Sequence, residues 1–492
     1  MSRSIIVVAG YDPAYLRITE HQVVSELARG REPLVLDITP IGVAPVDSFD
    51  RSALRRFGLD YPGQNLRGRL QGLGAEVRSI SEFIDDQSGD PLSDAIETEL
   101  AIAVQSALIT YFRTDKPDKT NTLVSRIGEG LAREGRMVYR AMTRAFSENR
   151  AVDTIYLPNG RFPNQKLAAF AARDSAIAPL HFEKGETPNG AYIQSYAPQN
   201  RLASQGAVEA VLQGLSPEVV DEIADEWLSR RAPSKESRNE FAALWHDDPP
   251  GDVAAWTAEQ RSIVGFFSSS QDEFQFLGPE WQLHDWEDQF VAFDRVLSEF
   301  EQNGFAAYLR VHPNLATKAH DCFVRERAGI RWLAEKHPEL LVIWHDDFAN
   351  TYSLLDSSDA VVVWDSTVGL EASARGIPVW TTATSRYGLV ADIRELLSSE
   401  DVEEHGLKTW EVDPHAAKKF IAYLVRRDQQ MSETYESWIP WDTGHPPLGV
   451  KIAAALVSGG TPRRSQALKS ILDVYRHRSL RSNLKHLRGR WS

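Results

Sequence analysis

The 492-residue chain contains a single cysteine, Cys322, which rules out an internal disulfide and a cysteine-rich zinc site. It also contains no apolar run long enough to span a bilayer. Residues 5–9 near its start are too few for the apolar part of a signal peptide and predict a first strand instead. From these absences we expect a cytoplasmic protein.

Positive charge is scarce, with 54 Lys and Arg against 69 Asp and Glu and a net charge of -15. This balance argues against a nucleic-acid-binding protein. The exception is the tail at 461–492, where nine basic side chains accompany one acid and a broken apolar stripe. The tail is expected to be either a peripheral anchor to anionic lipid at the inner face of the cell membrane or a helix packed across the N-terminal domain.

Apolar strand-like runs alternate with helical patterns along the first half of the chain. Strands are predicted at 5–9, 33–38, 154–157 and 177–181, and helices at 13–28 and 164–172. Such alternation predicts a parallel sheet with helices on both faces. Two amphipathic stretches, 91–113 and 120–146, predict a helical insertion in this domain.

The polar, breaker-rich stretch 246–252 is predicted to be a linker, because the alternation restarts after it and continues from 262 to 381. We therefore predict an α/β fold with two Rossmann-like, doubly wound domains that face a cleft. The predicted domains are 1–250, with the helical insertion at about 91–146, and 258–445, followed by C-terminal helices and the basic tail at 446–492.

The strongest local pattern is a buried strand, a small polar turn and a helix over residues 361–372. Ser366 or Thr367 is a suitable helix N-cap, and the amides beside it suit a phosphate. Glu371 lies one turn further along, where a carboxylate can accept hydrogen bonds from the hydroxyls of a ribose. The alternative interpretation is an ordinary capped helix with a solvated glutamate.

Two other predicted strands of the second domain end in polar residues. Arg310 and His312 alternate onto one face of a strand end, from which both can donate to phosphate oxygens or to the charge on a leaving diphosphate. Ser268, Ser269 and Ser270 end the first strand of this domain, at the edge of the predicted cleft.

In their order and spacing, these motifs resemble the GT-B glycosyltransferases of capsule-polysaccharide and lipopolysaccharide biosynthesis, which include bacterial Kdo transferases. The resemblance spans roughly residues 150 to 390. It is carried by residues 267–270 with 272–273, residues 310–314, Asn350 before a helix ending at 358–359, residues 365–372, and residues 376–379. Residues 159–162 followed by 183–185 look like the matching pair in the acceptor half.

The resemblance implies transfer of a sugar from a nucleotide-sugar donor to a polysaccharide or glycolipid acceptor in cell-surface glycan biosynthesis. It implies donor-binding roles for Ser268, Ser269, Ser270, Arg310, His312, Asn350, Ser366, Thr367 and Glu371. On the acceptor side it implies roles for Asn159 and Arg161. The sequence leaves the donor, the acceptor and the stereochemical course open.

No carboxylate pair has the spacing of metal ligands at a strand end, so we expect neither a metal nor another cofactor. Helix ends, Arg310 and His312 would then stabilise the leaving group. An inverting displacement also needs a base for the acceptor hydroxyl, and Asp12 and Glu183 both follow predicted strands of the first domain. Glu183 is preferred, because Asp12 precedes a proline and suits a helix cap.

Alternative functions remain open at this stage. A sugar-nucleotide 2-epimerase would show much the same fold and donor motifs without a second sugar. A non-catalytic assembly subunit of a polysaccharide machine would keep the fold without turnover. A polyol-phosphate transferase that uses a CDP-linked donor is a closer variant.

Overall fold

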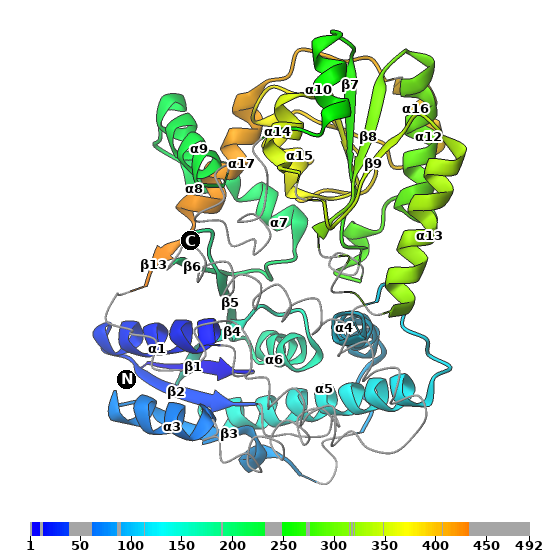
Figure 1. The fold of residues 1–492 in the computed structure, drawn as a ribbon. Helices are drawn as coiled ribbons and strands as arrows, with labels where there is room; N and C mark the ends of the chain where they lie inside the picture. The colour runs from blue at the N-terminus through cyan, green and yellow to red at the C-terminus, as the bar shows by residue number, and fades with distance from the viewer. Residues whose placement is uncertain are drawn as a thin grey trace, which may run out of the picture. The chain divides into compact units, whose positions relative to one another are not determined.

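The computed structural model describes residues 2–9, 13–38, 62–85, 90–112, 114–187, 190–231, 248–271, 276–313, 315, 318, 320–347, 349–405 and 407–431. Contacts within the chain define two compact units (Figure 1). Unit 1 comprises Met1–Phe112, Pro117–Pro198 and Gln429–Ser492, and unit 2 comprises Arg113–Lys116 and Gln199–Asp428.

Unit 1 contains a seven-stranded sheet in the order β13-β6-β5-β4-β1-β2-β3. Its strands are β1 (Arg3–Val8), β2 (Glu32–Asp37), β3 (Glu76–Ser79), β4 (Val152–Pro158), β5 (Ala178–Lys184), β6 (Gly190–Gln194) and β13 (Gln429–Gln430). β1 to β5 run parallel, whereas β6 pairs antiparallel with both β5 and β13. The strand order reverses between β1 and β4.

Helices cover both faces of this sheet. They are α1 (Pro13–Ala28), α3 (Pro62–Gly72), the 3-10 helix η2 (Ile80–Phe83), α4 (Asp94–Phe112), α5 (Thr122–Glu148) and α6 (Pro163–Asp174). Alternate residues of β1 point to opposite faces: Ile6 packs in one apolar cluster with α1 and α3, and Ile5 in another with α5 and α6. Both predicted helices of the insertion, α4 and α5, are therefore part of this unit.

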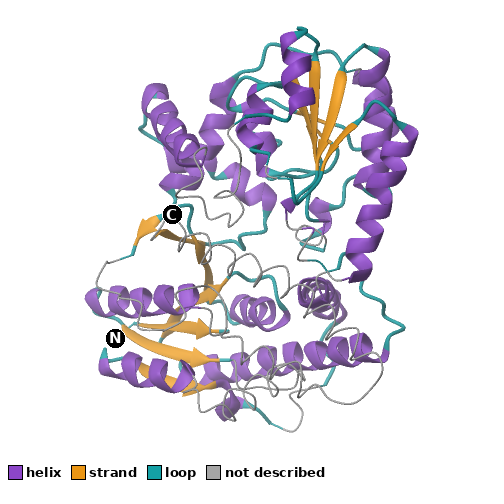
Figure 2. Ribbon diagram, viewed as in Figure 1, coloured by secondary structure: helices purple, strands orange, loops and turns teal. Residues whose placement is uncertain are grey.

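Unit 2 contains a six-stranded parallel sheet in the order β12-β11-β10-β7-β8-β9 (Figure 2). Its strands are β7 (Ile263–Phe267), β8 (Ala306–Arg310), β9 (Leu341–Ile343), β10 (Ala360–Val363), β11 (Val379–Thr381) and β12 (Arg394–Glu395). Here the strand order reverses between β7 and β10. Every residue of β7, β8 and β10 is buried, as expected for central strands covered on both faces.

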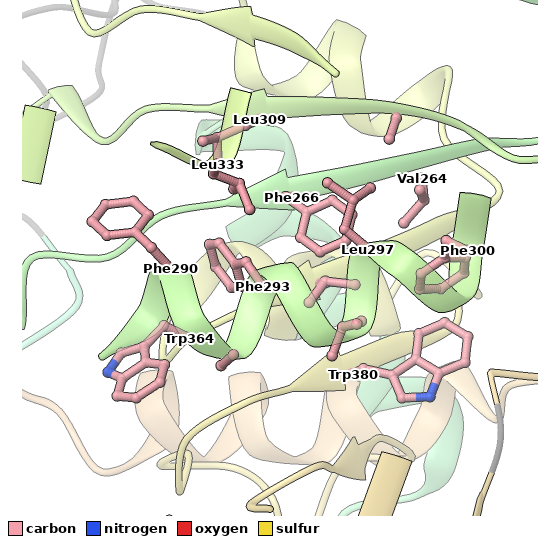
Figure 3. Packing of buried hydrophobic residues seen from close by; sticks show 14 of the residues in the cluster. Val264, Phe266, Phe290, Phe293, Leu297, Phe300, Leu309, Leu333, Trp364 and Trp380 are labelled. Carbon is pink, nitrogen blue, oxygen red and sulfur yellow. The ribbon is translucent and has the colours of Figure 1, made fainter. Parts of the chain in front are cut away.

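The helices of unit 2 are α7 (Arg201–Gly206), α8 (Val208–Leu212), α9 (Pro217–Arg231), α10 (Gly251–Ala258), η4 (Pro279–Trp281), α12 (Gln289–Gln302), α13 (His320–Lys336), α14 (Thr351–Asp356), α15 (Thr367–Ser373), α16 (Ser399–His405) and α17 (Pro414–Arg426). Figure 3 shows the core between α12 and the sheet. Phe266 lies edge-on to Phe293, with ring centroids 5.4 Å apart, and Phe300 meets Trp380 in the same way at 5.3 Å.

Helices α7 to α9 belong to unit 2, whereas the sequence analysis places residues 1–250 in the first domain. α8 and α9 share an apolar cluster with α15 and α17, which includes Trp227, Leu370 and Phe420. Arg201 at the start of α7 is buried, donates to the Ser385 carbonyl and pairs with Glu395 at 3.1 Å. These contacts join residues nearly 200 positions apart, which chain order does not reveal.

The predicted α/β class, with two Rossmann-like, doubly wound domains and a helical insertion in the first, is confirmed. Within the described ranges, every helix is too short or too polar to span a bilayer. Residues 432–492 lie outside the described part of the chain, so the predicted C-terminal helices and basic tail remain predictions.

Candidate functional site

The predicted serines of unit 2 follow β7 at the point where the strand order reverses. Ser269 Oγ donates to the Asp365 carbonyl at 2.9 Å, so this hydroxyl joins the ends of β7 and β10. Ser268 Oγ accepts from the His312 amide at 2.9 Å and thereby joins β7 to the end of β8. Ser270 Oγ is buried and has no hydrogen-bond partner among the described residues. The structure thus brings Ser268, Ser269 and His312 together at one edge of the sheet.

Arg310, the last residue of β8, is turned toward backbone carbonyls. Its guanidinium donates to the carbonyls of Trp344 (2.5 Å) and Asp347 (3.0 Å), which lie in the loop after β9. The side chain is buried, with 3% of the residue exposed, and burial lowers the pKa of its guanidinium to about 10. The sequence analysis predicted phosphate contacts for Arg310, but here its hydrogen bonds fix the loop that leads to Asn350.

Two further predicted donor residues are helix N-caps. The Asn350 side chain accepts from the Tyr352 amide at 2.9 Å and caps α14, and Ser366 Oγ accepts from the Val368 amide at 3.3 Å and caps α15. Thr367, the first residue of α15, is exposed. Of these three residues, only Thr367 is exposed, whereas Asn350 and Ser366 are half-buried.

Glu371 is placed as the sequence predicts, one turn into α15, but it is only 2% exposed. Its Oε1 lies 3.0 Å from Arg231 Nε, at the end of α9. Burial and the charge of Glu371 raise the pKa of the Tyr352 hydroxyl on α14. The carboxylate predicted for a ribose is therefore held between two side chains from other helices, and sequence reasoning found neither of these partners.

Asp365 is a residue to which the sequence analysis assigned no role. It directly precedes Ser366 and is 3% exposed, and its Oδ2 has no hydrogen-bond partner among the described residues. Burial raises the pKa of its carboxyl to about 7, although the charges of Arg386 and Arg201 act to lower it. The sequence signal that could have identified Asp365 is its position as an acid directly after the apolar residues 360–364.

The loop after β11 is tied to the same turn. Tyr387 OH donates to the Ser366 carbonyl at 2.7 Å, and the amide of Ser385 donates to the Glu395 carboxylate at 3.1 Å. Because Arg201 bridges Glu395 and the Ser385 carbonyl, a buried network fixes this loop beside the predicted donor turn. Sequence reasoning did not include this loop in the site.

In unit 1, Glu183 lies near the carboxyl end of β5 and accepts hydrogen bonds from three directions. Both of its carboxylate oxygens lie 2.6 Å from the Tyr15 hydroxyl on α1. The Lys184 amide donates to Oε1 at 2.9 Å, and Asn159 Nδ2 donates to Oε2. The structure therefore joins two predicted residues, Asn159 and Glu183, and adds Tyr15, which the sequence analysis missed.

The turn after β4 requires its glycine. Asn159 and Gly160 have φ values of +50° and +91°, in the left-handed region that asparagine and glycine tolerate. A Cβ on Gly160 would lie 2.7 Å from Nδ1 of His181. His181 is 1% exposed, and neither ring nitrogen has a hydrogen-bond partner among the described residues. Burial and the charge of Arg173 lower the pKa of its imidazole to about 4.

Arg161 connects this turn to the helical insertion. Its Nε donates to the hydroxyl of Ser106, a fully buried residue of α4. The insertion thus helps to orient a residue that was predicted to bind the acceptor. Asp12, Asp272, Glu273 and Asn314 lie outside the described residues. Among those that the structure describes, no three His, Cys, Asp or Glu side chains are grouped as a metal site would require.

Comparison with known proteins identifies one family. Residues 282–394 match the family described as Capsule polysaccharide biosynthesis protein. No curated protein matches the sequence.

Solved structures with a similar fold include two KpsC structures from Thermosulfurimonas dismutans. The beta Kdo 2,4 transferase is 15% identical, with a TM-score of 0.36 over 55% of this chain and 79% of its own. The beta Kdo 2,7 transferase is 12% identical, with a TM-score of 0.33 over 57% and 79%. UDP-GlcNAc 2-epimerase from Neisseria meningitidis, bound to UDP-GlcNAc, is 12% identical, with a TM-score of 0.27 over 82% and 89%. The match to the capsule polysaccharide biosynthesis family covers residues 282–394, which include the predicted donor residues from Arg310 to Glu371.

Proposed function

We propose that the chain is a glycosyltransferase of capsule-polysaccharide biosynthesis that transfers a sugar from a nucleotide-sugar to a glycan or glycolipid acceptor. Unit 2 is assigned to the donor, and unit 1 to activation of the acceptor hydroxyl. The reaction is proposed to need neither a metal nor another cofactor, and the protein is proposed to act in the cytoplasm. The family matched over residues 282–394 supports the biosynthetic role.

The observation that carries the proposal is the position of the polar turns in unit 2. Ser268–Ser270 follow β7, Ser366 follows β10, and the strand order of the sheet reverses between these two strands. Ligands of open α/β sheets bind beyond the carboxyl ends of the strands at such a reversal. The hydrogen bond between Ser269 and the Asp365 carbonyl joins the two turns directly.

Donor roles follow from this placement. Ser366, Thr367 and His312 are assigned to the phosphates of the nucleotide, and Glu371 to its ribose. Ser268 and Ser269 shape the site by fixing neighbouring turns. Arg310 and Asn350 contribute by holding the loop between β9 and α14, because Arg310 binds its carbonyls and Asn350 caps the helix after it.

For the acceptor, Glu183 is assigned as the general base, and Asn159 and Arg161 as binding residues. The base would take the proton of the acceptor hydroxyl as its oxygen bonds to the anomeric carbon and the bond from that carbon to the nucleotide phosphate breaks, so that the nucleotide leaves. Three donor groups orient the Glu183 carboxylate, and the residue is partly exposed. This combination suits a group that must meet a substrate in a fixed orientation.

The test combines donor binding with transfer. Thermal-shift measurements with UDP-, CMP-, GDP- and CDP-linked sugars identify the donor. Turnover is then followed as release of the free nucleotide in the presence of capsular oligosaccharides or a polar lipid extract. We expect one nucleotide class to bind and its release to depend on the acceptor. Formation of a C2 epimer without acceptor would instead identify an epimerase, and binding of no donor would favour a non-catalytic subunit.

Glu183→Gln is expected to keep donor binding and to lower the transfer rate by about 10²- to 10⁴-fold, because loss of a general base has effects of this size. The matched control is Glu148→Gln, which changes an exposed carboxylate at the end of α5 and should leave the rate unchanged.

If Glu183→Gln transfers sugar at a near-native rate and Asp12→Asn is inactive, then Asp12 is the general base instead of Glu183. If neither change affects turnover, a retaining route or another acceptor-side residue becomes the better account.

A further inference from the structure

We propose that Tyr15 is a positioning residue for Glu183, holding the carboxylate in the orientation from which it accepts the proton of the acceptor. This inference rests on the proposed function. Tyr15 belongs to no motif of the sequence, and it lies 168 residues from Glu183 along the chain. Only the packing of α1 beside β5 brings the two together.

The geometry of the hydroxyl carries the proposal. The Tyr15 oxygen lies 2.6 Å from Oε1 and 2.6 Å from Oε2 of Glu183, so its proton is shared between the two carboxylate oxygens. Hydrogen bonds to a carboxylate are shorter and stronger than those between neutral groups. A donor centred between both oxygens restrains rotation of the carboxylate as well as its position.

Each of the other two donors bonds to one oxygen of the carboxylate. The Lys184 amide bonds to Oε1 at 2.9 Å, and the Asn159 amide group bonds to Oε2. A carboxylate offers about four lone-pair sites, and the three donors occupy most of them, so they limit the directions from which a substrate hydroxyl can approach. Of these donors, we choose Tyr15 for the test, because its hydroxyl can be removed without altering the backbone or the charge of the protein.

The body of Tyr15 is held independently of its hydroxyl. Its ring packs against Phe182, with ring centroids 6.2 Å apart, and Lys184 Nζ lies 5.2 Å from the ring centre. Phenylalanine keeps both contacts, so Tyr15→Phe removes the hydroxyl that bonds to Glu183 while the ring stays in place.

The experiment compares Tyr15→Phe with wild type and repeats the change in the Glu183→Gln background. Transfer is measured with the most active pair from the panel of UDP-, CMP-, GDP- and CDP-linked sugars with capsular oligosaccharides or polar lipid extract. We expect Tyr15→Phe to lower kcat by about 10- to 100-fold with the donor KM unchanged, as for loss of a hydrogen bond to a charged group. In the Glu183→Gln background the same change should alter kcat by less than about twofold, because the two residues act as a unit.

Tyr139→Phe is the matched control. The Tyr139 hydroxyl on α5 also donates to a carboxylate, that of Asp174 at the end of α6, and belongs to the same unit. Removing it should leave kcat within about twofold of wild type. The comparison separates a general effect of losing a hydroxyl–carboxylate bond from an effect on Glu183.

Different outcomes separate this inference from the proposed function. A wild-type chain that transfers no sugar from any donor overturns both. An active chain in which Glu183→Gln is harmless overturns the inference and leaves the transferase standing. If Glu183→Gln is inactive and Tyr15→Phe is native-like, or if Tyr15→Phe has equal effects in both backgrounds, the positioning role is wrong.

Discussion

The two units use the polar residues at their strand ends in different ways. In unit 2, Ser269, Arg310 and Ser366 bond mainly to backbone groups and fix the turns that surround the predicted donor site. In unit 1, Tyr15, Asn159 and Glu183 bond to one another through their side chains. Residues that bond to backbone fix the shape of the loops around them, whereas the side-chain cluster around the partly exposed Glu183 carboxylate fits the base that we propose.

The buried titratable groups extend this contrast. Unit 2 buries an acid, Asp365, whose pKa is raised to about 7, and unit 1 buries a base, His181, whose pKa is lowered to about 4. Burial favours the neutral form in both cases. Because one neutral form carries the proton and the other lacks it, the two units should respond to pH in opposite directions.

The largest expected effect is that of Asp365 on unit 2. Between about pH 4 and pH 7 the folded carboxyl keeps a proton that the unfolded chain releases, so stability should fall as pH rises, by roughly 4 kcal/mol. Asp365→Asn should remove this fall. Hydrogen exchange in peptides covering β10 and α15 measures it locally. An unchanged pH dependence in Asp365→Asn would contradict the assignment.

His181 should have a slightly smaller effect of opposite sign on unit 1. As pH falls from about 6.5 to 4, the unfolded imidazole takes up a proton that the folded one refuses, so stability should fall by roughly 3 kcal/mol. Hydrogen exchange in peptides covering β4 and β5 reports the change locally. His181→Gln should make this exchange independent of pH, after correction for the intrinsic rate. If these peptides of the wild-type protein are equally protected from exchange at pH 4.5 and pH 7, the predicted contrast between the two units is wrong.

Glu371 provides the smallest test, at the donor site. Losing a carboxylate that binds the ribose hydroxyls should weaken nucleotide-sugar binding by roughly 1 to 3 kcal/mol, or about 5- to 150-fold. Glu371→Gln is preferred to alanine, because it keeps the volume beside Tyr352 and an oxygen for Arg231. Calorimetry with the donor found by thermal shift measures the effect. An unchanged affinity would show that Glu371 does not bind the donor and serves only its ion pair with Arg231.

Much of the fold could be predicted from local patterns. The predicted helix at 13–28 coincides with α1, the one at 164–172 lies within α6, and the strands predicted in the first domain are found within about three residues of their predicted ends. These elements carry continuous apolar runs or helical periodicity, which short windows of sequence record. β13 carries neither: Gln429–Gln430 is exposed and becomes a strand only by pairing with β6, more than 230 residues earlier.

The candidate site was predicted less completely, because residue type does not specify a partner. The structure joins Asn159 to Glu183, whose segments the sequence analysis paired, and their acceptor-side roles remain predictions. Tyr15 and His181 gave no recognisable signal in the sequence. For Arg310 the sequence signal was present but ambiguous, because a cation at a strand end can bind a phosphate or backbone carbonyls equally well. Asp365 interacts with Arg386 in the loop after β11, and no local sequence motif indicates this contact.

The sequence by itself determined two successive α/β domains, a helical insertion and motifs that resemble those of capsule-biosynthesis glycosyltransferases, because periodicity, turn residues and short motifs are local properties of the chain. The tertiary structure alone decided that α7 to α9 join unit 2, that Arg310 binds the backbone carbonyls of the loop after β9, and that Tyr15 meets Glu183. Each of these depends on a contact between segments distant in sequence. Its free energy comes from burial and hydrogen bonding that exist only once the chain has folded.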